Sequence, residues 1–270
     1  MRIAQSFERA RAENRAALGI FVNAGDPDPA TAMDILLGLP DQGVDFVELG
    51  MPFSDPMADG PSIQASSRRA LNAGMKLANV LEMAKTFRAR HADVPLILMG
   101  YFNPIYIYGV DRFIADACAA GVDGLIMVDL PPEEDEEFCL PARAAGLDII
   151  RLVTPTTDTQ RMPRVMANSS GFVYYVSITG ITGTRSASGA SIEAAMQRIK
   201  SVTDLPAVVG FGIRSKPQVA EAAVHADGVV VGSAIVDCLA ASLDESDAAT
   251  ATTVSDVLSL AAELAEGRHR

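Results

Sequence analysis

The sequence predicts a (β/α)8 TIM barrel, in which helices surround a closed ring of eight parallel strands, and three observations support this prediction. Short apolar segments recur about eight times along the chain, separated by stretches with helical spacing. These segments lack polar alternation, which is typical of parallel strands buried on both faces. The chain has 270 residues, a length that such barrels routinely use as one domain.

The expected strands are short runs of β-branched or large apolar residues. In chain order they are Gly19–Val22, Phe46–Leu49, Leu96–Met99, Gly124–Val128, Ile149–Val153, Phe172–Val176, Ala207–Val209 and Val229–Val231. A doubly wound open sheet is the alternative. The number of strands and the absence of a G-x-G-x-x-G motif after the first strand weigh against it.

Helical patterns fill the intervals between these strands. They cover Pro61–Arg90 as two helices, Asp111–Ala120, Glu133–Ala145, Ser191–Val202 and Lys216–Val224. Prolines at positions 132, 141 and 217 stand where first-turn prolines or helix breaks are typical. Two turns that lead into strands contain a glycine, Gly43 and Gly121, which suits the positive φ at a helix C-terminus.

Both ends of the chain are expected to add a helix to the barrel. The first 17 residues indicate a helix at the bottom of the barrel. Residues 244–270 indicate an appended segment with an amphipathic helix at Val254–Leu264 and no chemistry of its own. We therefore expect a single barrel domain across residues 1–270.

The composition argues against several classes of protein. The net charge of −12 disfavours a nucleic-acid surface, which needs clustered cations. No apolar run reaches the roughly 18 residues of a membrane span. The charged N-terminus lacks the apolar core of a signal peptide, so we expect a cytoplasmic protein. The three cysteines and three histidines are isolated, so the sequence predicts neither a disulfide framework nor a metal site.

The first candidate for catalysis is a carboxylate inside an apolar strand. Burial of an unpaired carboxylate costs several kcal/mol and raises its pKa, which makes Glu48 a usable acid or base. A structural ion pair beneath a helix is the alternative. The strand leads into a long loop containing Asp55 and Asp59, for which ordinary turn chemistry is the alternative. In such barrels the active site lies at these carboxyl ends of the strands.

Glycines follow the last three strands, at Gly180–Arg185, Gly210–Gly212 and Gly232–Ala234. Glycine lets backbone N–H groups approach an anion, and a helix N-terminus adds its dipole, so these loops predict a phosphate site rather than plain turns. The chain has four lysines, at positions 76, 85, 200 and 216, and all lie in helical stretches or at helix starts. A Schiff-base mechanism is thereby disfavoured. The remaining reaction types are isomerisation, cleavage by a lyase and hydrolysis, each driven by proton transfer from carboxyl groups.

The most specific motif is FVELGMPFSDPMADGPSIQ at residues 46–64, which resembles the signature of the tryptophan synthase alpha subunit family. Further segments agree in the same order: MGYFNP at 99–104, DLPPEE at 129–134, YVSITGITG at 175–183, GFGI at 210–213 and GSAI at 232–235. The resemblance extends from about Gly19 to Leu239, nearly the whole expected barrel.

The resemblance implies a lyase that cleaves indole-3-glycerol phosphate into indole and glyceraldehyde 3-phosphate by a retro-aldol reaction. Glu48 would move the protons at indole C3 and the glycerol hydroxyl, and Asp59 would bind the indole N–H. The substrate-binding positions that match the family are Phe21, Met99, Tyr174, Thr182, Gly183, Phe211, Gly212, Gly232 and Ser233. The small, polar segment at 184–189 is expected to be a mobile lid.

The resemblance also implies a partner, a pyridoxal-phosphate beta subunit that receives indole in an alpha2beta2 heterotetramer. The positions that match the family's docking loops are Ser54, Asp55, Pro56, Asp129 and Pro131, and docking replaces the turn interpretation of Asp55. No strand-end lysine is available to hold pyridoxal phosphate, so we expect this chain to carry no cofactor and no metal. The alternatives are a stand-alone lyase, a phosphosugar isomerase or epimerase, and a non-catalytic activating subunit.

Overall fold

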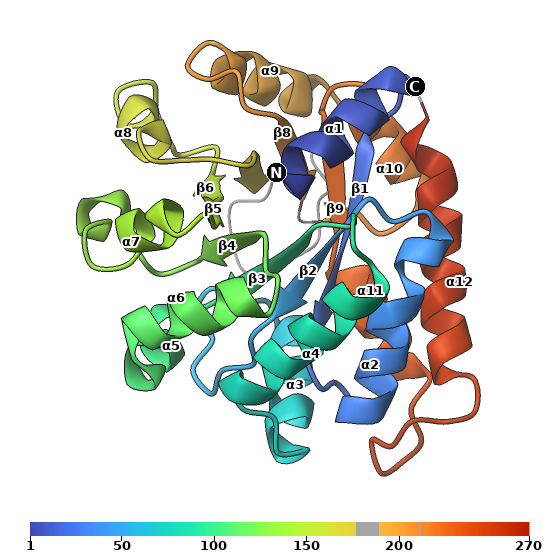
Figure 1. The fold of residues 1–270 in the computed structure, drawn as a ribbon. Helices are drawn as coiled ribbons and strands as arrows, with labels where there is room; N and C mark the ends of the chain where they lie inside the picture. The colour runs from blue at the N-terminus through green and yellow to red at the C-terminus, as the bar shows by residue number, and fades with distance from the viewer. Residues whose placement is uncertain (177–188, 211, 270) are drawn as a thin grey trace.

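The computed structural model describes residues 1–176, 189–210 and 212–269, and within them nine parallel strands form one barrel surrounded by helices (Figure 1). The strand order is β5-β4-β3-β2-β1-β9-β8-β7-β6. The two end strands, β5 (Asp148–Ile149) and β6 (Arg151–Val153), are separated only by Ile150 and are two parts of one strand. The first part pairs with β4 and the second with β7, so the sheet closes and the predicted (β/α)8 barrel is confirmed.

The remaining strands coincide with the apolar segments of the sequence. They are β1 (Ala17–Asn23), β2 (Phe46–Gly50), β3 (Leu96–Gly100), β4 (Gly124–Met127), β7 (Val173–Val176), β8 (Ala207–Gly210) and β9 (Gly228–Val231). Nearly every residue in them is buried, because one face of each strand points into the barrel and the other packs against helices. All eight strands expected from the sequence are therefore present.

The helices form an outer layer around the strands (Figure 1). They are α2 (Pro29–Gly38), α3 (Pro61–Asn72), α4 (Leu77–Arg90), α5 (Phe102–Tyr108), α6 (Val110–Ala119), α8 (Met162–Met166), α9 (Gly189–Lys200), α10 (Lys216–Ala223) and α11 (Ser233–Ala241), with 3-10 turns η1 (Pro40–Gln42), η2 (Pro132–Glu134) and η3 (Glu266–Arg268). The expected division of residues 61–90 into two helices is confirmed. Gly43 and Gly121 have φ of +84° and +79°, as expected for glycines that end helices.

One expected helix was wrong in its extent. Residues 133–145 form only η2 and a short helix, α7 (Cys139–Ala144). The chain turns between them because Asp135 points inward, is 4% exposed and pairs with the buried Arg151. This tertiary ion pair overrides the local helical spacing.

The N-terminal helix α1 (Arg2–Ala12) closes the bottom of the barrel. Its Phe7 ring lies 5.9 Å from Phe46, which begins β2, and 5.6 Å from Phe172, which precedes β7. Ile3 and Phe7 belong to the same buried cluster as the inward side chains of the strands. The expected extra helix is thus confirmed, although it ends at Ala12 rather than at residue 17.

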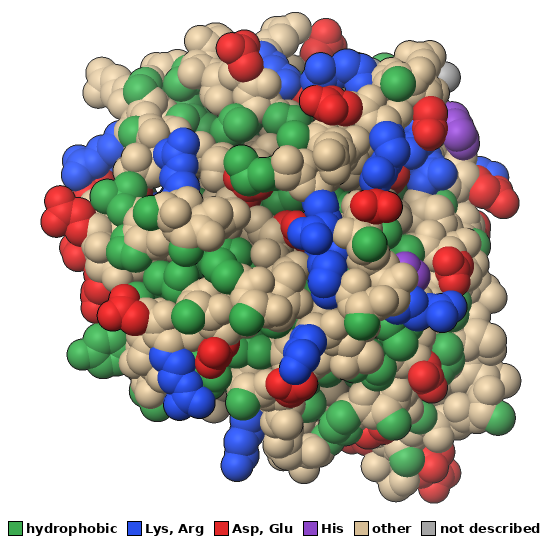
Figure 2. Space-filling model, viewed as in Figure 1, with side chains coloured by type: hydrophobic (Ala, Val, Ile, Leu, Met, Phe, Trp, Pro, Cys, Tyr) green, Lys and Arg blue, Asp and Glu red, His purple; other side chains and the backbone are tan. Residues whose placement is uncertain are grey.

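The C-terminal helix α12 (Thr253–Ala265) lies in the outer layer beside α2, as Figure 1 shows in red and blue. Val257, Ala261 and Leu264 are fully or almost fully buried, which explains the apolar face of its sequence. Charged side chains of both signs are interspersed over the face seen in Figure 2. No helix in the described ranges combines the length and the apolar character needed to cross a membrane.

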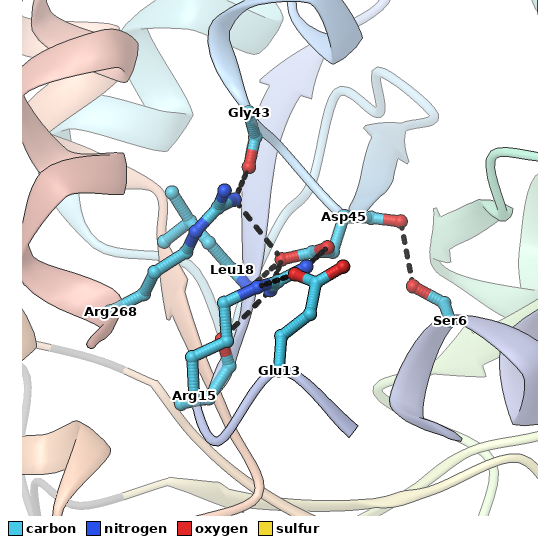
Figure 3. A network of polar contacts seen from close by, with 8 residues as sticks. Ser6, Glu13, Arg15, Leu18, Gly43, Asp45 and Arg268 are labelled. Carbon is cyan, nitrogen blue, oxygen red and sulfur yellow. Dashed lines mark hydrogen bonds and ion pairs between the residues drawn. The ribbon is translucent and has the colours of Figure 1, made fainter. Parts of the chain in front are cut away.

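Asp45, at the start of β2, joins three parts of the chain at the bottom of the barrel (Figure 3). Its carboxylate accepts hydrogen bonds from Arg15 Nη1 at 2.7 Å and Arg15 Nη2 at 2.9 Å, and from the Leu18 N–H at 2.9 Å. Arg268, from the C-terminal segment, lies 3.4 Å from the same carboxylate, and Ser6 of α1 donates to the Asp45 carbonyl at 3.0 Å. A two-point ion pair of this kind fixes direction as well as distance.

Replacing Asp45 is expected to test how far the bottom of the barrel depends on this network. In Asp45→Ala the buried Arg15 loses its buried partner and keeps only the exposed Glu13, so the free energy of unfolding in urea should fall by about 3–5 kcal/mol. The matched control is Glu13→Ala, because Glu13 pairs with the same arginine but is 58% exposed. Glu13→Ala should leave stability nearly unchanged, and equal losses in the two variants would contradict the role assigned to burial.

Candidate active site

Glu48 lies on β2 and points into the barrel. The register of the sheet places it beside Phe21 on β1 and Ile97 on β3, and both of these side chains belong to the inner apolar cluster. Tyr174 of β7, on the far side of the barrel, belongs to the same inner cluster, and its burial and the Glu48 carboxyl group raise its pKa. Strand alternation therefore sets this orientation, because residues two apart on a strand share a face.

The Glu48 carboxylate is fully buried, and neither oxygen has a hydrogen-bond partner among the described residues. Burial raises the pKa of Glu48 to about 8, because the charged form loses its hydration without gaining a partner. The structural alternative, an ion pair beneath a helix, does not match this position. Glu48 has the environment of a proton donor and acceptor rather than that of a structural carboxylate.

Apolar side chains form the walls around Glu48. Phe21, Met99 and Tyr174, all expected at the substrate, are buried members of the inner cluster. Val128 and Leu152 pack against the same cluster and remain partly exposed, as does Ile63 of α3. None of these three residues was predicted from the sequence to lie at the site. Val128 and Leu152 lie two residues after the inward Ile126 and Ile150. Since residues two apart on a strand share a face, this spacing could have predicted that both point into the barrel.

Asp59 is held in the loop after β2 by Tyr101, which follows β3. The Tyr101 hydroxyl accepts a hydrogen bond from the Ala58 N–H at 3.0 Å and donates one to the Asp59 carboxylate. Burial raises the pKa of Asp59 to about 6, and the hydrogen bond from Tyr101 limits the rise. Burial and the neighbouring Asp59 also raise the pKa of Tyr101, which keeps its proton for this bond. Tyr101 was in a quoted motif but was not assigned a role from the sequence.

A buried polar network fixes α3, which begins two residues after Asp59. Asn23, at the end of β1, donates to Ser66 Oγ and Ser67 Oγ of α3, both at 3.0 Å. Arg69 of α3 donates to Asp26 with Nε at 2.6 Å and Nη2 at 2.8 Å. The loop that carries Asp59 is thus held to the barrel at its far end as well as through Tyr101.

The glycines expected to bind phosphate lie near the same chamber. Gly232 precedes α11 and is so close to Phe21 that an added Cβ would lie 3.3 Å from the Phe21 Cβ. Ser233 opens α11, whose first N–H groups have no partner within the helix and favour an anion. Gly212 has a φ of +82°, a conformation that L side chains rarely adopt. Thr182, Gly183, Phe211 and residues 184–188 of the expected lid at 184–189 lie outside the described residues, and Gly189 is the first residue of α9.

The residues expected to dock a partner lie on two loops, one after β2 and one after β4, with β3 between these strands. Ser54, Asp55, Asp129 and Pro131 are exposed and Pro56 is half-buried, with Ser54 Oγ donating to Asp55 at 2.5 Å. The Phe102 N–H donates to Asp129 Oδ1 at 2.9 Å. Since Phe102 follows Tyr101, which contacts the loop of Asp59, the two groups of docking residues flank the candidate site.

The arrangement provides two carboxyl groups with different protonation states near neutral pH. Glu48, in an apolar chamber, keeps its proton up to about pH 8. Asp59, in a loop with a hydroxyl donor, loses its proton near pH 6. One group can therefore donate a proton while the other stabilises positive charge, beside a helix N-terminus suited to phosphate.

Comparison with known proteins gives a consistent result. The family model of the tryptophan synthase alpha chain matches residues 7–265. A structure of Mycobacterium tuberculosis tryptophan synthase has 35% sequence identity over 100% of this chain and 98% of the other, with a TM-score of 0.88. Tryptophan synthase subunit alpha of Legionella pneumophila has 35% identity over 98% of this chain and 97% of its own, also with a TM-score of 0.88. An Aquifex aeolicus structure is similar, at 33% identity and a TM-score of 0.87 over 100% and 99% of the chains.

The buried Glu48 predicts that stability depends on pH. The unfolded chain ionises this group near its ordinary pKa of 4.5, whereas the folded protein keeps the proton up to about pH 8. Between these values the folded state binds more protons, so the free energy of unfolding falls as the pH rises. Glu48→Gln removes this dependence. The free energy of unfolding of the variant minus that of wild type should therefore be about 3 kcal/mol larger at pH 8 than at pH 5.

Urea denaturation of both proteins at the two pH values measures this difference. Glu8→Gln is the matched control, because Glu8 is exposed on α1. It should show the same pH dependence as wild type. A Glu48→Gln variant whose stability advantage did not grow between pH 5 and pH 8 would show that Glu48 is ionised in the folded protein.

Proposed function

The chain belongs to the tryptophan synthase alpha chain family, and from this premise we propose how its residues carry out the reaction. It is a lyase that catalyses the alpha reaction of tryptophan biosynthesis, the cleavage of indole-3-glycerol phosphate to indole and glyceraldehyde 3-phosphate. One observation supports the assignment of Glu48 as the acid and base. Its carboxyl group is fully buried in the chamber and has no hydrogen-bond partner among the described residues. Membership of this family does not favour the two alternative functions, a phosphosugar isomerase or epimerase and a non-catalytic activating subunit.

Glu48 serves first as an acid and then as a base. Its neutral carboxyl group, with a pKa of about 8, protonates indole C3, which leaves a positive charge on the ring nitrogen. The resulting carboxylate accepts the proton of the glycerol hydroxyl next to the ring. A carbonyl forms there, the bond to C3 breaks, and its electron pair returns to the ring, giving indole and the aldehyde. Glu48 ends with the proton it began with, so the cycle needs no other acid or base.

Asp59 stabilises the positive charge that develops on the ring nitrogen. With a pKa of about 6 it is ionised near neutral pH and accepts a hydrogen bond from the indole N–H. Tyr101 holds the carboxylate in place through its hydroxyl. A charged acceptor that is already oriented needs no rearrangement when the charge appears, which is the main advantage of a preorganised site.

The two ends of the substrate suit the two surroundings of the chamber. Phe21, Met99 and Tyr174 provide apolar surface for the indole ring. Gly183, Gly212, Gly232 and Ser233 provide backbone N–H groups and a helix N-terminus for the phosphate. Phe211 is proposed to line the indole pocket, and Thr182 to contact Asp59. Phe21 contacts both regions, since it packs close to Gly232, so the ring and the phosphate have a fixed separation.

The family implies a beta-subunit partner, and we propose an alpha2beta2 heterotetramer as the assembly. Ser54, Asp55, Pro56, Asp129 and Pro131 form the proposed docking surface. Three exposed apolar side chains belong to the same region: Met57 is 82% exposed in the loop of Asp55, and Tyr106 and Ile107 on α5 are 61% and 77% exposed. Large exposed apolar side chains gathered beside one site favour a protein contact.

We propose that pyridoxal phosphate belongs to the beta subunit and that this chain uses no cofactor or metal. Its four lysines support this proposal: Lys76 begins α4, and Lys85, Lys200 and Lys216 lie on α4, α9 and α10 of the outer layer. None of these positions faces the chamber, where a Schiff base would have to form. All three cysteines are free thiols, which supports a cytoplasmic location.

The two carboxyl groups predict a bell-shaped pH profile for kcat/KM. Activity requires Asp59 ionised and Glu48 protonated, so the rate should fall below about pH 6 and above about pH 8. Glu48→Gln should lower kcat by about 10²–10⁴-fold. Asp59→Asn should abolish the acid limb of the profile, and a steady-state assay of indole-3-glycerol phosphate cleavage measures both.

Tyr101→Phe distinguishes the role of Asp59 from a general loss of structure. Without the hydroxyl, the pKa of Asp59 rises, so the acid limb should move to higher pH while the basic limb stays in place. An acid limb that persisted in Asp59→Asn would assign it to another group.

Partner docking is tested with Met57→Asp. A charge in place of an exposed apolar anchor should weaken binding of a beta subunit by about tenfold or more in calorimetry. Val224→Asp is the control, because Val224 is also an exposed apolar residue, 61% exposed, but follows α10 away from the docking loops. Wild-type cleavage that is fast alone and unchanged by a beta subunit would instead favour a stand-alone lyase.

A further inference from the structure

Arg151 is a buried arginine on β6 that reaches the loop after β4. Its side chain is 6% exposed, and it points away from the chamber, because its neighbour Leu152 packs on the inner cluster. Nη1 donates to the Leu130 carbonyl oxygen at 2.9 Å, and Nη2 forms an ion pair with Asp135. Arg151 thus contacts two points of the segment 129–135, which we name the docking loop because it contains Asp129 and Pro131.

The other contacts of the docking loop complete a frame. Asp135 is 4% exposed, and its second oxygen accepts from Asn168 Nδ2 at 2.9 Å. At the opposite end, Asp129 accepts from the Phe102 N–H at 2.9 Å. Between these anchors the Leu130 side chain is buried, whereas Pro131 is exposed. These contacts therefore fix the backbone on both sides of the exposed Pro131 and the half-buried Pro132.

Stability alone does not explain a charge at this position. A buried ion pair often stabilises a fold no better than apolar side chains of similar volume. The Arg151 Nε is also buried without a partner among the described residues, which adds to the cost of burial. An apolar pair would not supply the hydrogen bond to the Leu130 carbonyl oxygen. The planar guanidinium of Arg151 binds this carbonyl with Nη1 and the Asp135 carboxylate with Nη2, in a fixed relative geometry.

A second ion-pair group on the same loop provides a contrast. Glu133 lies 3.3 Å from Arg161 and 3.2 Å from Arg164, but both arginines are exposed. Exposed pairs are screened by solvent and restrain a backbone weakly. Arg151 is therefore the cation that can hold the docking loop in one conformation.

We propose that Arg151, with Asp135, is a positioning residue that holds the docking loop in the conformation the beta subunit binds. The inference rests on the proposed docking function of Asp129 and Pro131. A preformed loop loses less conformational entropy on association than a loose one, so the frame should raise affinity without contacting the partner.

The test compares two sets of variants. The double variant Arg151→Met with Asp135→Leu removes both charges and keeps an apolar filling, so the chain should fold with a near-wild-type melting temperature. Amide hydrogen exchange of residues 130 and 133–135 in the isolated chain should become about tenfold faster or more, because the loop loses its anchor. The dissociation constant for the pyridoxal-phosphate-loaded beta subunit should rise by about tenfold. The matched control, Arg164→Met, should change neither quantity.

Arg151→Lys covers the case in which the double variant does not fold. Lysine keeps a positive charge for Asp135 but is shorter and lacks the fixed pair of Nη donors that reaches the carboxylate and the Leu130 carbonyl oxygen together. The contact with Leu130 should therefore weaken, and loop exchange should still rise while the fold persists. Unchanged exchange in the folded variants would overturn the anchor itself, whether or not a partner binds. Faster exchange with wild-type affinity would overturn its link to docking. If the wild-type chain bound no beta subunit, the proposed docking function would be wrong, and the exchange rates alone would then show whether Arg151 anchors the loop.

Discussion

The burial of the Glu48 carboxyl group inside a closed barrel is the constraint around which this structure is organised. An unpaired ionised carboxylate in such a place is costly, so the group stays protonated to about pH 8. Burial of the other inward side chains offsets this cost in folding free energy, because nearly all of them are apolar and closely packed, from Phe7 and Phe172 at the bottom to Met99 near the top. A smaller or open sheet would admit water to Glu48 and return its pKa to the ordinary range.

Stability and chemistry are separated along the barrel axis. At the bottom, polar groups are paired: Arg15 and Arg268 converge on Asp45, and Arg2 and Arg88 both bind Asp123. Near the carboxyl ends of the strands, Glu48 is left without a partner among the described residues. Groups that already have partners resist rearrangement, whereas an unpaired group can exchange protons with a substrate. This division matches the general pattern of barrel enzymes, in which loops at the carboxyl ends carry the chemistry.

The sequence was sufficient for whatever depends on short-range pattern. Buried parallel strands appear as apolar runs, and a glutamate inside one of them was visible as an anomaly. Partners that meet only in three dimensions were not visible. Tyr101 and Asp59 lie far apart in the chain, and the Arg151–Asp135 pair interrupts a segment whose local spacing favours one helix. Leu152 and Val128 could have been found from strand alternation, had the inward face of each strand been assigned before the structure was known.

The proposed docking surface and the chamber share the same strands, which suggests a physical route between them. On β6, Arg151 faces the docking loop while Leu152, the next residue, faces the chamber. After β3, the Tyr101 hydroxyl binds the loop of Asp59, and the backbone N–H of the next residue, Phe102, donates to Asp129. Adjacent residues on an extended chain point to opposite faces, so a strand or strand end displaced from outside must also move the side chain inside. The proposed docking loop and the chamber are therefore supported by the same two backbone segments, β6 and the end of β3.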